Sequence, residues 1–275
     1  RITDIATAFG EVVDIKSRFT ATHSTNVARS AVNIGRQLGL EGDGLWHLEL
    51  AGQLHDIGKL NVPTTTLNKE GKLTSEEWDQ IRRHPADTRR VMVSTDLFAP
   101  LADLAANHHE KLDGSGYPLG LKENEVHRFA RLTAVADVYD ALTAKRVYKP
   151  AMPMYQALLR IHKNKGTEFE EHAVDLFVKT LGLYPVGSLV ELNNKERGVV
   201  YEPNPSDSRK PTVGLFTTSN QKPRGAPFIV NMAIRSEAEG REIVKVLDPE
   251  REGIDIEDML KEVAQRGERT ERMRR

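Results

Sequence analysis

A histidine, an aspartate and a lysine stand close together in the stretch Leu54-His55-Asp56-Ile57-Gly58-Lys59-Leu60. A neutral imidazole and a carboxylate together suit a divalent transition metal, and a lysine beside that metal suits a phosphate. The same residues also fit the end of an ordinary helix, in which Gly58 terminates the helix and His55 packs in the core. Both interpretations stay open on this stretch alone.

Further histidines and a second aspartate lie on the inward faces or core-side ends of predicted helices, because apolar residues recur around them at helical spacing. The complete set is His23, His55, Asp56, His84, His108, His109 and Asp137. Five of the nine histidines of the chain belong to it. A core rarely contains so many histidines that pack independently of one another, so the pattern favours a common site.

The two aspartates of this set need compensating positive charge, because an unpaired ionised carboxylate in an apolar interior costs on the order of several kcal/mol. Metal ions would supply that charge. Seven nitrogen and oxygen ligands exceed what one tetrahedral site uses, so we predict two metals bridged by a shared carboxylate. Asp56 is the natural bridge, because it stands beside His55 at a helix end and adjacent helical residues point about 100° apart.

Helices must position these side chains. Helical spacing of apolar residues extends over residues 2–40 and again over about 45–57. Thr74 and Glu77 form a capping box that opens the next helix, and Pro85 must end or kink it. Further helices are predicted near residues 100–110, 127–145, 155–165 and 170–181. The pattern therefore predicts a mainly α fold over residues 1–185.

Short β-type runs separated by Asn, Gly and Pro clusters follow Pro185. They cover residues 186–192, 198–201, 213–217, 228–233 and 242–247. We therefore predict a small C-terminal β appendage over residues 186–248. A charged tail over residues 249–275 follows, in which apolar positions near Met259 and Val263 favour one amphipathic helix and the last ten residues fray.

Composition limits the classes of function. The hydrophobic content of 39% and the charged content of 29% are typical of a soluble globular protein, and the net charge of −1 gives no field that would attract duplex nucleic acid. The chain has no cysteine, which excludes disulfides and thiolate metal sites. We expect a cytoplasmic protein, since no membrane segment or secretion signal is recognisable. The opening at Arg1, in mid-pattern, suggests a fragment that lacks an upstream regulatory domain.

Residues from about 22 to 181 resemble the HD-GYP family of HD phosphohydrolases. The stretch His55-Asp56-Ile57-Gly58-Lys59 matches the HD motif, and residues 108–118, HHEKLDGSGYP, match the family's second motif. The resemblance implies an HD-type helical bundle whose metal site hydrolyses cyclic di-GMP through a hydroxide that bridges two metals, with pGpG as the first product and GMP as the product of a second cut. The β appendage lies outside the resemblance and has no predicted function.

The resemblance also implies roles for single residues. One metal would be held by His23, His55, Asp56 and Asp137, and the second by Asp56, His84, His108 and His109. Lys59 would meet a phosphate and act with Asp56 in catalysis, Tyr117 would lie near the substrate, and Arg146 and Lys149 would bind the other phosphate. Some family members bind a third metal through a glutamate that Phe19 replaces here. We therefore expect two divalent ions, drawn from Fe, Mn, Ni, Co or Zn.

Two alternatives stay open. The domain could be a cyclic-dinucleotide sensor, or a module that docks a protein partner through the loop of residues 114–118. It could also be a phosphodiesterase for another cyclic dinucleotide such as cyclic GMP-AMP. Retention of all seven predicted ligands favours the enzyme, since a degenerate sensor should have lost some of them. A protein partner at the loop and a homodimer are compatible with either.

Overall fold

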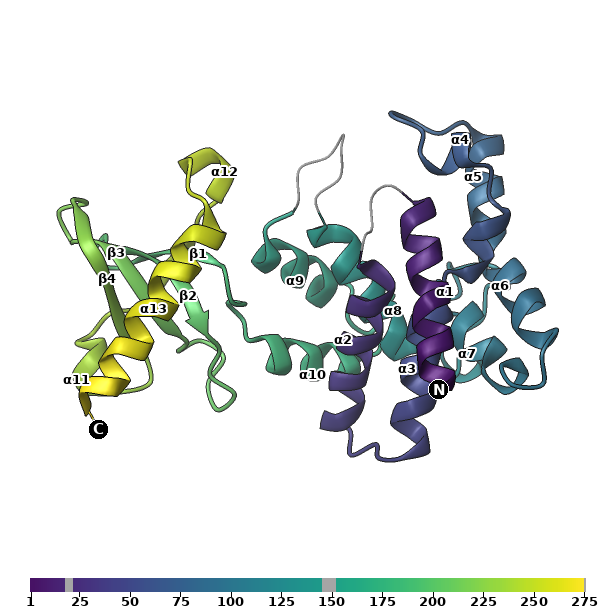
Figure 1. The fold of residues 1–275 in the computed structure, drawn as a ribbon, viewed down its shortest axis with the longest axis horizontal. Helices are drawn as coiled ribbons and strands as arrows, with labels where there is room; N and C mark the ends of the chain where they lie inside the picture. The colour runs from purple at the N-terminus through teal and green to yellow at the C-terminus, as the bar shows by residue number, and fades with distance from the viewer. Residues whose placement is uncertain (18–21, 145–151, 275) are drawn as a thin grey trace. The chain divides into compact units, whose positions relative to one another are not determined.

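The computed structural model describes residues 1–17, 22–144 and 152–274, with side chains up to residue 266. The chain forms two compact units (Figure 1). The first comprises Arg1–Met152 and Leu159–Phe177 and is helical, and the second comprises Pro153–Leu158 and Val178–Arg275 and holds the sheet. The predicted mainly α fold with a small C-terminal β part is confirmed.

The helical unit consists of α-helices connected by short 3-10 turns, which are labelled η. These elements are α1 (Ile2–Lys16), α2 (His23–Gln37), α3 (Asp43–Leu54), η1 (Ile57–Asn61), α4 (Thr64–Leu67), α5 (Ser75–Arg82), α6 (His84–Val93), η2 (Ala99–Leu101), α7 (Ala102–Ala106), η3 (Glu123–Glu125) and α8 (Arg128–Thr143). Two further helices, α9 (Met154–Lys163) and α10 (Glu171–Leu181), are each shared between the two units.

Close packing around α2 and α3 brings the predicted ligands within reach of one another. α2 packs against both α3 and α8, and α1 lies against α2 and α3 (Figure 1). A Cβ at Gly52 would lie only 2.6 Å from the Cα of Ala28, so a glycine is required where α2 crosses α3. The adjoining core cluster consists of Ala6, Val13, Leu50, Ala51, Leu54, Ile57, Met92, Phe98, Leu101, Ala102 and Ala105.

The capping box before α5 forms as predicted. The hydroxyl of Thr74 accepts a hydrogen bond from the Glu77 amide at 3.3 Å, and the Glu77 carboxylate accepts one from the Thr74 amide at 2.7 Å. Pro85 lies in the first turn of α6, where its missing amide hydrogen is not needed. α5 therefore ends at Arg82, and a new helix begins at His84.

The second unit is built around one antiparallel sheet. Its strands are β1 (Leu189–Leu192), β2 (Arg197–Glu202), β3 (Thr212–Thr217), β4 (Pro223–Asn231) and β5 (Ile243–Val246), in the order β4-β3-β2-β1-β5. The short helices α11 (Arg235–Ala238) and α12 (Pro249–Glu252) and the long helix α13 (Ile256–Arg274) complete it. The apolar core comprises Val190, Leu192, Val200, Val213, Leu215, Val230 and Met232.

α13 packs against β2 and β4, as Figure 1 shows for the yellow helix.

A buried carboxylate also connects separate segments of this unit. Glu196, after β1, receives ion pairs at 2.6 Å from both Arg224 on β4 and Arg241 before β5. One carboxylate therefore connects β4 and the segment before β5 to the turn after β1.

Three sequence-based boundaries were wrong. The helix predicted to reach Ile57 ends at Leu54, because the Gly58 amide donates to the hydroxyl of Thr88 and the chain enters a 3-10 turn. The helix predicted to end near residue 110 ends at Ala106. The C-terminal helix, in contrast, continues to Arg274 through the stretch that was predicted to fray.

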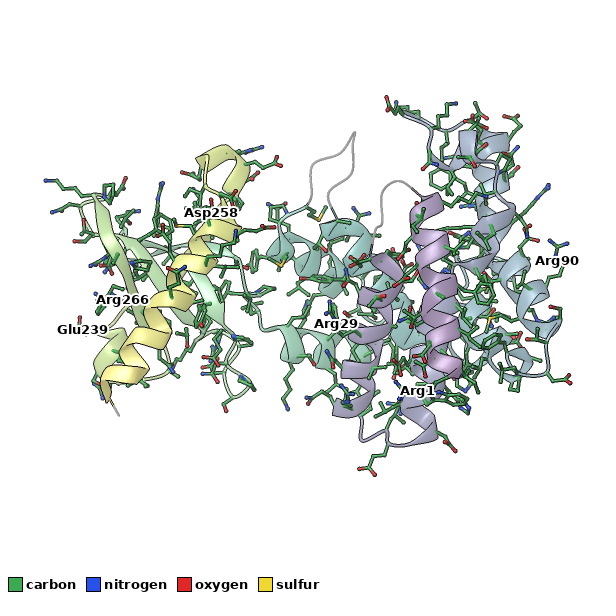
Figure 2. The ribbon with its side chains drawn as sticks, in the orientation of Figure 1. Arg1, Arg29, Arg90, Glu239, Asp258 and Arg266 are labelled. Atoms are coloured by element: carbon green, nitrogen blue, oxygen red, sulfur yellow. The ribbon has the colours of Figure 1, made fainter. Side chains whose placement is uncertain are left out.

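Charged side chains such as Arg29 and Arg90 extend outward from the helical unit in Figure 2, and both are exposed. Among the described residues, no helix is long and apolar enough to cross a membrane.

Candidate metal centre

The structure brings all seven predicted ligands together inside the helical unit. His23 opens α2, His55 and Asp56 follow α3, His84 opens α6, and Asp137 lies in the middle of α8. The remaining two, His108 and His109, follow the end of α7. Their potential ligand atoms form two groups, in each of which the atoms lie within 4.8 Å of one another. One group is Asp56, His84, His108 and His109, and the other is His23, His55 and Asp137.

Asp56 lies between the two groups, and its two carboxylate oxygens face opposite ways. Oδ2 is 3.3 Å from Nε2 of His55 and 3.7 Å from Nε2 of His23. Oδ1 is 3.1 Å from Nε2 of His84 and 3.7 Å from Nε2 of His108. A carboxylate in this position can contact a cation in each group.

Asp137 also faces both groups. Its Oδ1 lies 3.2 Å from Nε2 of His23 and 3.8 Å from Nε2 of His55, while its Oδ2 lies 3.7 Å from Nδ1 of His109. The two carboxylates are therefore enclosed by imidazoles on several sides, and both are buried.

Four imidazoles are oriented by hydrogen bonds at Nδ1. In three of them, Nδ1 lies close to the carbonyl oxygen of the residue three positions earlier. The pairs are His55 with Gly52 at 2.7 Å, His84 with Ile81 at 2.6 Å and His108 with Ala105 at 2.7 Å. His23 faces the carboxylate of Asp140 at 2.7 Å. A ring that donates from Nδ1 presents the lone pair of Nε2 on its other side, and here all four Nε2 atoms point to the carboxylates.

Buried atoms without hydrogen-bond partners mark the middle of the cluster. Among the described side chains, Nε2 of His55 and Oδ1 of Asp56 are fully buried and have no such partner. A lone pair and a carboxylate oxygen left unpaired in the interior cost free energy that a metal cation would recover. The donor set of imidazole nitrogens and carboxylate oxygens thus fits a metal centre of divalent transition ions.

The protonation of the carboxylates supports the same conclusion. Burial opposes ionisation of Asp56, but charge on His55 and Lys59 holds the pKa of its carboxyl well below the usual range. Burial likewise opposes ionisation of Asp137, yet the hydrogen bond from His23 and nearby imidazole charge keep its pKa well below the usual range. Both groups are therefore ionised near neutral pH.

The imidazoles differ from one another. Burial lowers the pKa of His109 to about 3 and places the pKa of His108 well below its usual value, so both rings are neutral and ready to bind a metal. Burial also opposes protonation of His23, but hydrogen bonds to Asp137 and Asp140 prevail and raise its pKa to about 10. A metal at His23 would displace that proton.

Three residues that the sequence motifs did not single out as functional hold this arrangement. Asp140, one helical turn after Asp137, orients His23. The hydroxyl of Thr88 accepts from the Gly58 amide at 3.0 Å and donates to the His55 carbonyl at 2.9 Å. Only a glycine fits at position 58, because a Cβ there would lie 2.0 Å from the carbonyl oxygen of His84. The spacing of Asp140 from Asp137 is the signal that could have identified it.

Glu110 shapes the loop after the double histidine. Its carboxylate accepts hydrogen bonds from the amides of Leu119 at 2.7 Å and Leu121 at 3.0 Å, which closes the loop over its own start. Tyr117 in this loop stacks on His109 with ring centroids 4.7 Å apart, and burial raises its pKa. Arg82 lies over the Tyr117 ring at 5.3 Å.

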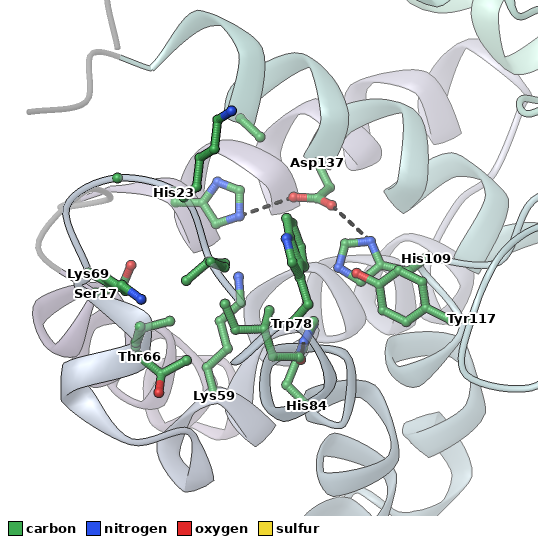
Figure 3. A pocket seen from close by; sticks show the side chains of 16 residues that line it. Ser17, His23, Lys59, Thr66, Lys69, Trp78, His84, His109, Tyr117 and Asp137 are labelled. Carbon is green, nitrogen blue, oxygen red and sulfur yellow. Dashed lines mark hydrogen bonds and ion pairs between the residues drawn. The ribbon is translucent and has the colours of Figure 1, made fainter. Parts of the chain in front are cut away.

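A cavity of about 570 Å³ opens onto the cluster (Figure 3). His23, His84, His109 and Asp137 reach its surface. Lys59 also lines it, and its ammonium group pairs with Oδ2 of Asp56. The cavity volume suits a small organic ligand, and a lysine beside the carboxylates suits a bound phosphate. Arg146 and Lys149, the other predicted phosphate ligands, lie outside the described residues, as does Phe19.

Comparison with known proteins links this geometry to a family. A model described as HD domain matches residues 8–172, which is more than half of the chain. The cyclic di-GMP phosphodiesterase PA4108 of Pseudomonas aeruginosa is 39% identical over 205 residues, which cover 74% of this chain and 49% of that protein. The 3'3'-cGAMP-specific phosphodiesterase 3 of Vibrio cholerae is 42% identical over 182 residues, covering 66% of this chain and 39% of that protein.

This chain therefore spans about half or less of the length of these relatives. A crystal structure of a cyclic GMP-AMP-specific phosphodiesterase from Vibrio cholerae superposes with a TM-score of 0.51 at 15% identity, over 64% of this chain and 47% of that chain. At this low identity the likeness shows a shared fold.

Proposed function

Since the chain belongs to the HD domain family, as the sequence motifs predicted, we propose that it is a metal-dependent phosphodiesterase that hydrolyses cyclic di-GMP. One observation carries the proposal: the carboxylate of Asp56 faces two groups of imidazoles with opposite oxygens, beside a cavity of about 570 Å³ that Lys59 also lines. The relative of 39% identity named as a cyclic di-GMP phosphodiesterase supports the substrate.

We assign two divalent ions to the centre, one to each group of ligands. Asp56 would contact both ions, and Asp137 would be a further carboxylate ligand. When bound, such ions activate water as a nucleophile and offset the charge of the phosphate oxygens. Imidazole and carboxylate ligands suit Fe, Mn, Ni, Co or Zn, and geometry alone does not select among them.

The residues of the chain supply orientation and charge. Lys59, at the edge of the cavity, would exchange its ion pair with Asp56 for a contact to a non-bridging phosphate oxygen and so stabilise charge that develops during attack. Tyr117 would limit the position of the substrate beside His109. Cleavage of one phosphodiester of cyclic di-GMP yields linear pGpG, and cleavage of the second linkage yields GMP.

Cyclic GMP-AMP is the second candidate substrate, because the relative of 42% identity is named as specific for 3'3'-cGAMP. The two cyclic dinucleotides share the phosphodiester ring and differ in one purine base. Neither sensing without turnover nor docking of a protein through residues 114–118 is favoured by the geometry, since all seven ligands converge. A cytoplasmic location, a homodimer and a protein partner remain predictions.

The test is turnover of both cyclic dinucleotides, followed by chromatography, with anaerobically purified protein whose metals are counted by elemental analysis. We expect about two metals per chain and the appearance of pGpG or GMP. Asp56→Ala should abolish turnover and reduce bound metal, whereas the matched variant His162→Ala, at an exposed histidine, should change neither. Metal-loaded protein that cleaves neither dinucleotide would refute the proposal.

A further inference from the structure

Trp78 is a large apolar side chain left half exposed beside the metal centre. It lies in the middle of α5, a helix that has no buried residue, and 51% of its surface is exposed. A tryptophan stabilises a fold mainly by burying its large ring, and a half-exposed ring contributes less of this free energy. Its side chain lines the 570 Å³ cavity, and in Figure 3 it extends in the direction of Asp137.

The Trp78 ring has neither an aromatic nor a cationic partner in the part of the chain that the structure describes. Among the described residues it stacks on no other aromatic ring and lies beneath no cation. Tyr117, the other tyrosine or tryptophan of the cavity, is different, because it contacts both His109 and Arg82. Trp78 is therefore a half-exposed aromatic side chain of the cavity wall that is not already engaged by a ring or a cation of the described residues.

The surroundings of Trp78 define the kind of ligand. Apolar side chains of Leu67, Leu73 and Ile81 line the same cavity and would cover the edge of a flat ring. Lys72 lines it as well, which favours an anion, and so does Lys69, whose ammonium group pairs with Glu77 at 2.6 Å. A flat apolar group joined to negative charge is the chemistry of a nucleotide.

We propose that Trp78 is a substrate-binding residue that stacks against a purine base of the cyclic dinucleotide. The inference rests on the proposed function and extends it to the site of one base. Stacking of a base on an aromatic side chain contributes about 1–3 kcal/mol and tolerates a change of base, because every base has a π face. Trp78 accordingly selects a dinucleotide over a small phosphodiester, and it does not separate cyclic di-GMP from cyclic GMP-AMP.

The helix that carries Trp78 also touches the metal centre. Ile81 lies three residues after Trp78, so the two side chains are neighbours on one face of the helix. The carbonyl oxygen of Ile81 accepts a hydrogen bond from Nδ1 of His84. A base held by Trp78 would thus be fixed relative to a metal ligand through a single turn of backbone. This connection fits a role in placing the phosphate for attack.

Steady-state kinetics of Trp78→Ala test the proposal on three substrates: cyclic di-GMP, 3'3'-cGAMP and methyl p-nitrophenyl phosphate, a diester whose single ring is the leaving group. We expect kcat/KM for the cyclic dinucleotide that the protein cleaves to fall about 5- to 150-fold, mostly through KM, while methyl p-nitrophenyl phosphate changes less than about twofold. Trp78→Phe should restore most of the loss. Phe9→Ala, at an exposed aromatic residue of α1 away from the cavity, should leave all three unchanged.

An equal loss on all three substrates would mean that Trp78 is structural, and no loss on the dinucleotide would also overturn the inference. Fluorescence separates this failure from failure of the proposed function. The chain has two tryptophans, so in Trp46→Phe the emission comes from Trp78 alone. Cyclic di-GMP or 3'3'-cGAMP should quench it even if turnover is absent, and a lack of quenching by both would refute the stacking.

Discussion

Removal of the Asp140 carboxylate should weaken metal binding without unfolding the helical unit. Oδ2 of Asp140 lies 2.7 Å from Nδ1 of His23 and fixes the ring so that Nε2 points to Asp56 and Asp137. A hydrogen bond to a charged group contributes about 1.5–3 kcal/mol. Loss of that amount from the metal-bound state corresponds to about a 10- to 150-fold higher Kd for the ion near His23. Outer hydrogen-bond partners of metal ligands have effects of this size.

The assay is competition for metal against a chelator of known affinity, measured for Asp140→Ala and Asp140→Asn. The asparagine keeps an acceptor for the His23 proton but removes the charge, so its loss should be the smaller of the two. Asp103→Ala is the matched control, because this exposed carboxylate pairs with Arg89 at 2.7 Å and its removal should change metal affinity little. If Asp140→Ala binds metal as tightly as the unaltered protein, orientation of His23 by Asp140 is not what the centre needs.

Three further predictions concern the support of the site. Thr88→Ala should lower the free energy of unfolding by about 1–3 kcal/mol, because the Gly58 amide and the His55 carbonyl lose their shared partner, and Thr88→Ser should restore most of it in a urea titration. Glu110→Gln should speed amide hydrogen exchange at residues 119 and 121 while bound metal stays constant; unchanged exchange would contradict the role of the carboxylate as loop anchor. Removal of metal by a chelator should lower Tm in a way that added metal reverses, since a ligand bound to the folded state stabilises it; a Tm that is indifferent to metal would argue against a centre.

The candidate site was more predictable from the sequence than the ends of the helices that hold it. Periodicity placed His23 and Asp137 on inward faces, because apolar neighbours at helical spacing define such a face without knowledge of the tertiary structure. The end of α3 depends instead on the Gly58 amide finding the Thr88 hydroxyl from another helix. The sequence near residue 57 does not show a contact to a residue thirty positions later, so the prediction extended α3 too far.

Orientation of the rings was likewise beyond the sequence. The family resemblance predicts that His23 is a ligand, but the orientation of its two nitrogens is set by Asp140, more than a hundred residues later. Open aromatic surface is a property of the folded chain as well. Trp78 follows the capping box of Thr74 and Glu77 in the sequence, and only the tertiary fold shows that its side chain lines a cavity.

The backbone carbonyls that aim the imidazoles impose a rule on related sequences. Gly52, Ile81 and Ala105 act through main-chain oxygens, so the side chain itself does not orient the ring that follows. Packing restricts Gly52 and the buried Ala105, whereas the half-buried Ile81 could be replaced by other side chains. Spacing, in contrast, is inflexible. One residue inserted between Ile81 and His84 would turn the imidazole by about 100° around the local helical path and aim it away from the carboxylates. Across homologues, position 81 should therefore vary in identity, while the three-residue interval before each histidine admits neither insertion nor deletion.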